Sequence, residues 1–295
     1  MSFVATLISR PDRRALSQNT AHKAAEAVGA SAIDWLDEAV ACDLVLPDAL
    51  SPEDADARLR DLLALVPVDI AVQDAAARRK KLLIADMDST MIDQECIDEL
   101  ADEIGIKEHI AAITARSMNG EIAFEPALRE RVALLKGLAT SVIGEIIEKR
   151  ITLASGGREL VATMRAAGAW TALVSGGFDA FTGPIAARLG FHENHANRLV
   201  EEDGRLAGLV VEPILGRAAK ARSLLSIAGR LGISPDDAIA VGDGANDLDM
   251  LALAGTGVAL HAKPAVAAAA RVRIDYGDLT ALLYLQGYRR RDFVS

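Results

Sequence analysis

The chain has 295 residues, a formal net charge of −10, and 51% hydrophobic but only 4% aromatic residues. This length exceeds that of a usual single domain, so we expect one large domain with a smaller companion, or two comparable domains. The aliphatic composition favours helices packed on parallel strands, which indicates an α/β protein. The negative charge argues against nucleic acid or an anionic membrane as a partner, whereas a small anion in a local cationic pocket remains an allowed ligand.

Cysteine spacing and the lengths of the apolar runs predict the compartment. Cys42 and Cys96 have neither CxxC nor zinc-ligand spacing, so we expect no disulfide framework and no structural metal. No basic segment with an apolar core opens the chain, and no apolar run approaches the roughly 20 residues that span a bilayer. We therefore expect a soluble protein of the cytoplasm, without a membrane partner.

The first 78 residues have the pattern of a small α+β domain. Apolar alternation and helical periodicity predict the order β-α-β-β-α-β, with strands at 4–8, 32–36, 38–46 and 68–73 and helices at 15–28 and 54–65. This order is typical of a ferredoxin-like sandwich with both helices on one face of the sheet. The basic run at 78–81 either marks a domain boundary or is a solvated charged surface.

A second pattern begins at Leu82, where short apolar runs each end in small, polar or acidic residues. These runs predict buried parallel strands of a Rossmann-like sheet at 82–85, 172–174, 238–241 and 258–260. Ligands gather at the carboxyl ends of such strands. We therefore expect Asp86, Ser175 and Asp243 to converge on one edge of the sheet, within a domain at 79–295.

The segment between the first two of these strands is too long and too helical for an ordinary crossover. It predicts an inserted helical cap at about 94–155, with helices at 94–104, 107–116, 125–136 and 140–149. Further along, an Asp203-Gly204 turn between β-like segments predicts a hairpin at 197–211. We expect this hairpin to add an antiparallel ribbon to the edge of the sheet.

Two acidic clusters follow predicted strands. In the run 86–90, Asp86 and Asp88 could attack phosphorus and move protons, or they could cap the next helix, which is the commoner role of such a pair. The run 242–247 is also acidic, and its glycines permit a close approach of the backbone to a ligand. One carboxylate from each loop could hold Mg²⁺ beside a phosphate.

Two further segments supply donors for phosphate oxygens. Ser175-Gly176-Gly177 offers a hydroxyl and unobstructed backbone amides at the end of a strand, although this signal is weak alone. Lys220 begins a helical stretch, where a lysine is by default solvated. Lys220 is a candidate only because of its place in the chain order of the motifs, after Ser175-Gly176-Gly177 and before the acidic run 242–247.

The ordered set of these motifs resembles the haloacid dehalogenase-like hydrolases. The set comprises DxDxT at 86–90, Ser-Gly-Gly at 175–177, Lys220, and Gly-Asp-Gly-x-Asn-Asp at 242–247, within roughly 82–277. Inside that superfamily, the segments 118–136 and 174–179 are similar to the phosphoserine phosphatase family. The resemblance implies hydrolysis of O-phosphoserine to serine and phosphate through an aspartyl-phosphate with Mg²⁺, the last step of serine biosynthesis.

The resemblance also implies roles for individual residues. Asp86 would be the nucleophile, and Asp88 would protonate the leaving serine oxygen and later take a proton from water. Metal ligands would be Asp86, the backbone carbonyl of Asp88, and Asp243, with Asp247 helping directly or through water. The phosphoryl oxygens would be held by Ser175, the amide of Gly176 and Lys220, with Asn246 supporting them.

Substrate choice would depend on the cap, because a zwitterionic amino acid needs one anionic and one cationic partner. Glu95 would receive the ammonium group and Arg131 the carboxylate, whereas by themselves these two would be a solvated glutamate and a surface arginine. Arg131 lies three positions from Leu128 and Leu134, beside an apolar stripe. A charged group there is easier to explain if it faces a ligand.

The small domain is similar in topology to the ACT-like modules that precede many such enzymes. Its first strand-helix turn, residues 9–13, has no glycine, so we favour dimerisation over serine binding as its role. A signalling receiver is a rival class, but it would lack the helical insertion. A second rival is a phosphatase or phosphotransferase of the same superfamily that acts on another small metabolite, such as homoserine phosphate.

Overall fold

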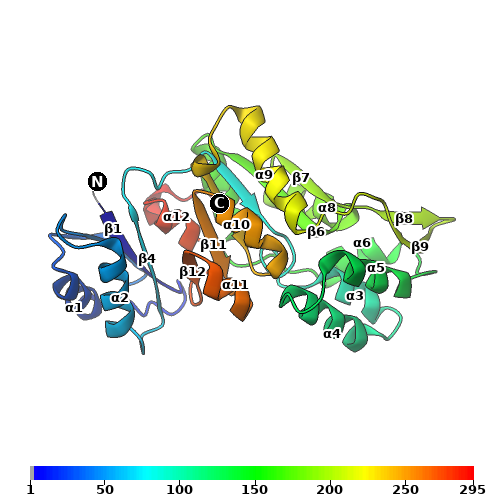
Figure 1. Ribbon diagram of the computed structural model, residues 1–295, viewed down its shortest axis with the longest axis horizontal. Helices are drawn as coiled ribbons and strands as arrows, with labels where there is room; N and C mark the ends of the chain where they lie inside the picture. The colour runs from blue at the N-terminus through cyan, green and yellow to red at the C-terminus, as the bar shows by residue number, and fades with distance from the viewer. Residues whose placement is uncertain (1–2) are drawn as a thin grey trace.

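The structure is a computed structural model that describes residues 3–295 of the chain. Three units are arranged along its longest axis: a small N-terminal sheet with two helices, a central parallel sheet, and a group of helices at the far end (Figure 1). No helix between residues 3 and 295 combines the length and the apolar character needed to span a bilayer.

The N-terminal unit is a four-stranded antiparallel sheet in the order β2-β3-β1-β4. Its elements are β1 (Phe3–Ser9), α1 (Gln18–Val28), β2 (Ile33–Asp37), β3 (Ala41–Val45), α2 (Pro52–Leu62) and β4 (Val68–Asp74). Both helices pack on one face of the sheet, in a core that includes Ala24, Leu59 and Leu44. This arrangement confirms the predicted ferredoxin-like fold. Helix α1 begins later than predicted because Ser17 caps it, accepting a hydrogen bond from the amide of Thr20.

The central sheet has six parallel strands in the order β12-β11-β10-β5-β6-β7. Four were predicted: β5 (Leu82–Ala85), β6 (Trp170–Phe178), β10 (Ala238–Gly242) and β11 (Thr256–Leu260). The two edge strands, β7 (Glu193–Asn197) and β12 (Val272–Ile274), were not predicted. An edge strand buries less surface, so the polar sequence of β7 carries no apolar run to reveal it.

Alternate side chains of the central strands enter two different cores, as the pleat requires. Leu83 and Ala85 pack with α7 (Gly157–Ala166), α8 (Asp179–Leu189) and α12 (Ala281–Leu285). Leu82 and Ile84 pack on the opposite face, against the helices α9 (Arg217–Leu231), α10 (Leu248–Leu253) and α11 (Pro264–Ala269). These layers of helices on both faces of a parallel sheet confirm the predicted α/β class.

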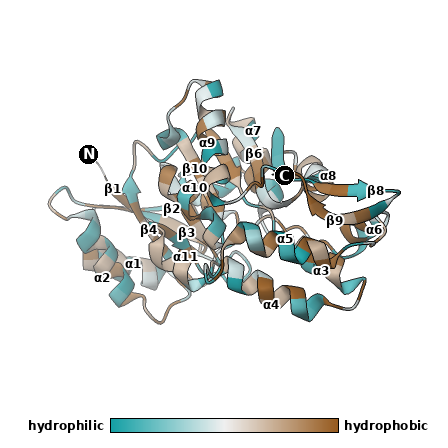
Figure 2. Ribbon diagram, turned by 45° about the vertical axis from the view of Figure 1, so that its right-hand side comes forward, coloured by the Kyte–Doolittle hydropathy of each residue, from teal (hydrophilic) through white to brown (hydrophobic). Residues whose placement is uncertain are grey.

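A helical cap is inserted between β5 and α7. It consists of α3 (Cys96–Asp102), α4 (Lys107–Met118), α5 (Phe124–Leu134) and α6 (Val142–Lys149), close to the four predicted ranges. Hydrophilic and hydrophobic residues alternate along α4, as expected for a helix with one buried face (Figure 2). The limits of the cap, about 94–155, and of the two domains, 1–78 and 79–295, stay predictions.

The predicted hairpin is present, but its predicted position was wrong. Strands β8 (Leu199–Glu202) and β9 (Arg205–Val210) are joined by the Asp203-Gly204 turn, in which both residues have positive φ. They form a separate two-stranded sheet instead of extending the central one. The backbone of Leu206 bonds to Gly137 and Leu138, which follow α5. The hairpin therefore extends the cap, because its free hydrogen-bonding groups are satisfied there.

The second face of the small sheet packs on the central unit. Ile8, Ala41 and Ala71 from the small sheet belong to the same core as the α12 side chains. Buried Asp69 on β4 accepts hydrogen bonds from three successive backbone amides, those of residues 275–277, at 2.7 to 3.2 Å. Both faces of the small sheet are thus covered, and one carboxylate fixes the loop that follows β12.

Replacing Asp69 tests this contact between the units. Asp69→Ala leaves three backbone amides without their acceptor, so we expect the free energy of unfolding to fall by about 2–4 kcal/mol. Asp56→Ala is the matched control, because Asp56 forms only a surface ion pair with Arg60 on α2. Chemical denaturation followed by circular dichroism measures both variants. Equal stability of the two variants would contradict this role for Asp69.

Candidate active site

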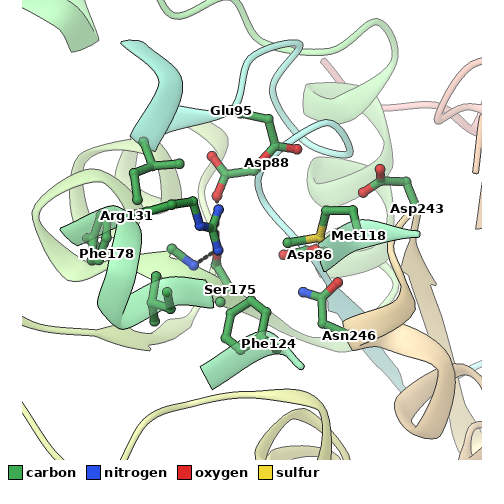
Figure 3. A pocket seen from close by; sticks show the side chains of 14 residues that line it. Asp86, Asp88, Glu95, Met118, Phe124, Arg131, Ser175, Phe178, Asp243 and Asn246 are labelled. Atoms are coloured by element: carbon green, nitrogen blue, oxygen red, sulfur yellow. Dashed lines mark hydrogen bonds between the residues drawn. The ribbon is translucent and has the colours of Figure 1, made fainter. Parts of the chain in front are cut away.

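One pocket lies between the carboxyl edge of the central sheet and the cap, and it encloses about 430 Å³ including its opening. Its predicted members are Asp86, Asp88, Glu95, Arg131, Ser175, Gly176, Asp243 and Asn246. Figure 3 shows Arg131 on one side of this pocket and Asp243 and Asn246 on the other. The structure thus brings together residues separated by up to 160 positions, although their chemical roles stay predictions.

The remaining two predicted residues, Lys220 and Asp247, lie directly behind Asp86. The Lys220 ammonium is 2.7 Å from Asp86 Oδ2 and 2.7 Å from Asp247 Oδ1, and its side chain is 0% exposed. Burial by itself would lower the pKa of Lys220, but the carboxylates of Asp247 and Asp86 raise it above its usual value. Lys220 is therefore a permanent buried cation and not the solvated lysine that its sequence context favours.

Three carboxylates at this edge could hold a metal ion. Asp86, Asp243 and Asp247 each offer one oxygen within 4.8 Å of the others, and all three are buried. Burial, followed by the charge of Asp86, raises the pKa of Asp243 to about 6. Among residues 3–295, Asp243 Oδ2 accepts no hydrogen bond, and its nearest cation is the Lys263 ammonium at 3.4 Å. An oxygen-only donor set with excess negative charge suits a hard divalent cation.

Asp88 lies between the two loops that form the site. Its Oδ1 accepts the amide of Cys96 at 2.9 Å, and its Oδ2 accepts the hydroxyl of Ser175 at 3.3 Å. Burial, followed by the charge of Asp86, raises the pKa of Asp88 to about 6. Asp88 therefore satisfies the first amide of α3, the capping role considered above, and still presents a carboxyl group that can gain or lose a proton near neutral pH.

Ser175-Gly176-Gly177 ends strand β6 at the floor of the pocket. The amide of Gly177 donates to the buried Ser175 hydroxyl at 2.8 Å. A Cβ on Gly176 would lie 2.7 Å from the Phe124 ring, and one on Gly177 would lie 2.6 Å from Asp88 Oδ2. Neither position has room for a side chain, so a ligand can approach the backbone of Gly176 closely, while the amide of Gly177 is used by Ser175.

Two supporting residues were not found from the sequence. Asn197, buried at the end of β7, donates to the carbonyl of Gly176 at 2.9 Å. Lys263 lies 3.4 Å from Asp243 Oδ2 and follows strand β11. Asn197 ends β7, so the rule that located Asp86 would have located it had β7 been predicted. Lys263 follows β11, which was predicted, so the same rule could have located it from the sequence.

Glu95 enters the pocket from the start of α3. It occupies the N-cap position of this helix, yet its side chain makes no capping bond. Instead, Oε1 accepts the Ser89 hydroxyl at 2.8 Å. Burial, followed by the charges of Asp88 and Asp243, raises the pKa of Glu95 well above its usual value. A cationic ligand group would offset this repulsion and favour the ionised form.

Arg131 projects into the pocket from α5 and is only 2% exposed, so it is not a surface arginine. Its Nε donates to the carbonyl of Ala127 at 3.1 Å, and its Nη1 donates to the Thr114 hydroxyl at 3.0 Å. Among the described residues Nη2 has no partner. Because a buried donor without an acceptor is costly, Arg131 is suited to receive an acceptor from a ligand.

Residues 83–252 match the family of haloacid dehalogenase-like hydrolases. The chain is 47% identical to the phosphoserine phosphatase of Albidiferax ferrireducens over 70% of its length and 89% of that protein. A had family hydrolase from Salmonella enterica serovar Typhi has a TM-score of 0.84, 32% identity, and coverage of 96% of this chain and 98% of that chain. A phospho-aspartyl intermediate analogue of phosphoserine phosphatase has a TM-score of 0.67, 41% identity, and coverage of 70% and 98%.

The chain therefore belongs to the haloacid dehalogenase-like hydrolase family. The Salmonella similarity covers almost the whole chain, so it includes the small domain as well as the central sheet and cap.

The buried cation at Lys220 gives a test that does not depend on catalysis. Lys220→Met leaves Asp86 and Asp247 without their shared partner, so we expect the free energy of unfolding without added metal to fall by about 3–5 kcal/mol. Lys149→Met is the control, because Lys149 forms only an exposed pair with Glu145. Denaturant titration compares the two variants. A Lys220→Met protein as stable as the control would mean that the carboxylates repel each other little.

Proposed function

We propose that this protein is a phosphatase that hydrolyses O-phosphoserine to serine and inorganic phosphate. The observation that carries the proposal is a pocket with two opposite charges in its cap, Glu95 and Arg131, facing the Asp86 carboxylate of the core. A phosphorylated amino acid presents an ammonium, a carboxylate and a phosphate, and each of these groups finds a complementary partner. The names of the similar phosphatases support the same substrate.

In the proposed complex, Arg131 Nη2 donates to the substrate carboxylate and the Glu95 carboxylate accepts from the ammonium. The phosphoryl oxygens receive hydrogen bonds from the Ser175 hydroxyl, the amide of Gly176 and the side chains of Lys220 and Asn246. Phe124 and Met118 line the same pocket and reduce the access of water.

The proposed reaction has two displacements at phosphorus. A carboxylate oxygen of Asp86 attacks phosphorus, the bond to the serine oxygen breaks, and Asp88 donates a proton to that oxygen. Asp88 then takes a proton from water, which attacks phosphorus and breaks the bond to Asp86. Inorganic phosphate leaves, and both carboxyl groups return to their starting states. The raised pKa of Asp88 suits a group that must act once as an acid and once as a base.

We propose Mg²⁺ as the metal, held by Asp86, the backbone carbonyl of Asp88, Asp243 and Asp247. The ion would neutralise charge between these carboxylates and the phosphate. Lys263 and Lys220 add positive charge beside the same carboxylates.

The biological setting follows from the proposed product. Release of serine makes the reaction the last step of serine biosynthesis, and we place it in the cytoplasm. We also propose a homodimer formed through the small domain. Leu65, which is 99% exposed, and Leu62 lie at the end of α2 and offer apolar surface for such a contact.

Phosphate release tests the reaction and its metal. With Mg²⁺, we expect the protein to release phosphate from O-phosphoserine faster than from homoserine phosphate, and to stop when a chelator removes the metal. A malachite-green assay over both substrates, with and without excess chelator, measures this. A faster rate on homoserine phosphate would favour the rival metabolite.

Asp86→Asn serves as the control variant in that assay. It keeps the shape of the side chain but removes the nucleophile, so turnover should fall below detection, and fluoride-beryllium should no longer inhibit by mimicking the phosphorylated carboxylate. Turnover at the wild-type rate would exclude Asp86 as the nucleophile.

Arg131→Ala tests recognition of the carboxylate. Loss of a buried charged donor should raise KM for O-phosphoserine by about 100-fold, with a nearly unchanged KM for O-phosphoethanolamine, which lacks only the carboxylate. Arg129→Ala is the matched control, because Arg129 lies on the same helix but forms exposed pairs with Glu125 and Glu212. Equal losses on both substrates would show that Arg131 supports the cap and does not select the substrate.

A further inference from the structure

We propose that Thr114 positions Arg131 for the substrate and separates it from Asp98, so that the arginine keeps its charge available for a carboxylate. The proposal rests on the proposed function, in which Arg131 binds the carboxylate of phosphoserine. It adds a specificity-determining residue that does not itself line the pocket.

Two hydrogen bonds hold the guanidinium group of Arg131 in place. Nε is held by the carbonyl of Ala127, one turn earlier on the same helix, and this contact fixes only the base of the group. The bond from Nη1 to the Thr114 hydroxyl, at 3.0 Å, is the hydrogen bond that holds the far end from another helix. Two fixed contacts define the plane of the guanidinium group, which points into the pocket (Figure 3), and leave Nη2 for a ligand.

The hydroxyl proton of Thr114 points away from Arg131. A hydroxyl has one hydrogen, and because Arg131 donates to its oxygen, that hydrogen must go elsewhere. Two acceptors lie within reach, Asp98 Oδ1 at 3.1 Å and the carbonyl of Ile110 at 3.0 Å. Thr114 is 4% exposed, and its branched side chain restricts rotation. The hydroxyl oxygen is therefore held as an acceptor toward Arg131.

Thr114 also separates the charges of Arg131 and Asp98. Among residues 3–295, Arg131 forms no ion pair with a carboxylate, and Asp98 is joined to it only through the Thr114 hydroxyl. A direct Asp98–Arg131 pair would satisfy the arginine and compete with the substrate. The neutral hydroxyl thus orients Arg131 and lies between its guanidinium group and the Asp98 carboxylate. Three helices contribute one member each: α3 Asp98, α4 Thr114 and α5 Arg131.

The test compares two substrates that differ only in the carboxylate. Thr114→Val keeps the shape of the side chain but removes the hydroxyl, so we expect KM for O-phosphoserine to rise about tenfold with little change in kcat. KM and kcat for O-phosphoethanolamine should stay unchanged. Thr114→Ser restores the hydroxyl and should behave nearly as wild type. In Thr114→Val, the further change Asp98→Asn should recover part of the lost affinity, because it removes the competing charge.

Thr182→Val is the matched control, since Thr182 on α8 is a buried threonine whose hydroxyl bonds to Asn194 on β7 and to neither Arg131 nor Asp98. Thermal unfolding checks that each variant is folded. The proposal is overturned if Thr114→Val weakens both substrates equally, if Thr114→Ser fails to rescue, or if Asp98→Asn recovers nothing.

These outcomes also separate the inference from the function on which it rests. If wild-type protein does not prefer O-phosphoserine to O-phosphoethanolamine, the proposed function fails, and the inference fails with it. If wild-type protein shows the preference and Thr114→Val retains it, only the inference fails.

Discussion

The structure of the site depends on one buried ion-pair arrangement, the Lys220 ammonium between Asp86 and Asp247. Parallel strands bring carboxylates to a single edge, and their mutual repulsion in a region of low dielectric constant would be large without a fixed cation. Lys220 reaches this edge because α9 covers one face of the sheet and points its first turn toward the strand ends. A second cation, Lys263, lies 3.4 Å from Asp243 Oδ2 and offsets the charge of the third carboxylate.

Arg131, the buried cation of the cap, has partners of a different kind from those of Lys220. Lys220 is satisfied by two carboxylates, whereas Arg131 is held by a carbonyl and a hydroxyl and keeps one nitrogen without a partner. The two cations therefore differ: two fixed carboxylates offset the charge of Lys220 and leave it one N–H group, whereas Arg131 is completed by a ligand in the proposed complex. In the proposed function, this division gives the phosphate chemistry to the central sheet and the recognition of the rest of the substrate to the helices inserted into it.

Much of this arrangement was predictable because its causes are local in the sequence. Asp86, Ser175 and Asp243 each follow a short apolar run, and the geometry of parallel strands then places them together. The attachment of the β8–β9 hairpin was not predictable, since its backbone partners, Gly137 and Leu138, are distant in sequence. Thr114 gave no signal either, because its role depends on a contact between two helices and not on any spacing within one.

The small domain and the cap share a support on the central unit. Asp69 binds the loop that follows β12, and the next residue of that loop, Asp278, accepts the Ser155 hydroxyl at 2.6 Å. Ser155 lies where the chain returns from the cap, just before α7. There a Cβ on Gly156 would lie 2.7 Å from the backbone nitrogen of Thr280, so the two segments pack without space for a side chain. The loop that follows β12 thus bonds to the small domain on one side and to the base of the cap on the other. It links these two units without using any carboxylate of the proposed reaction.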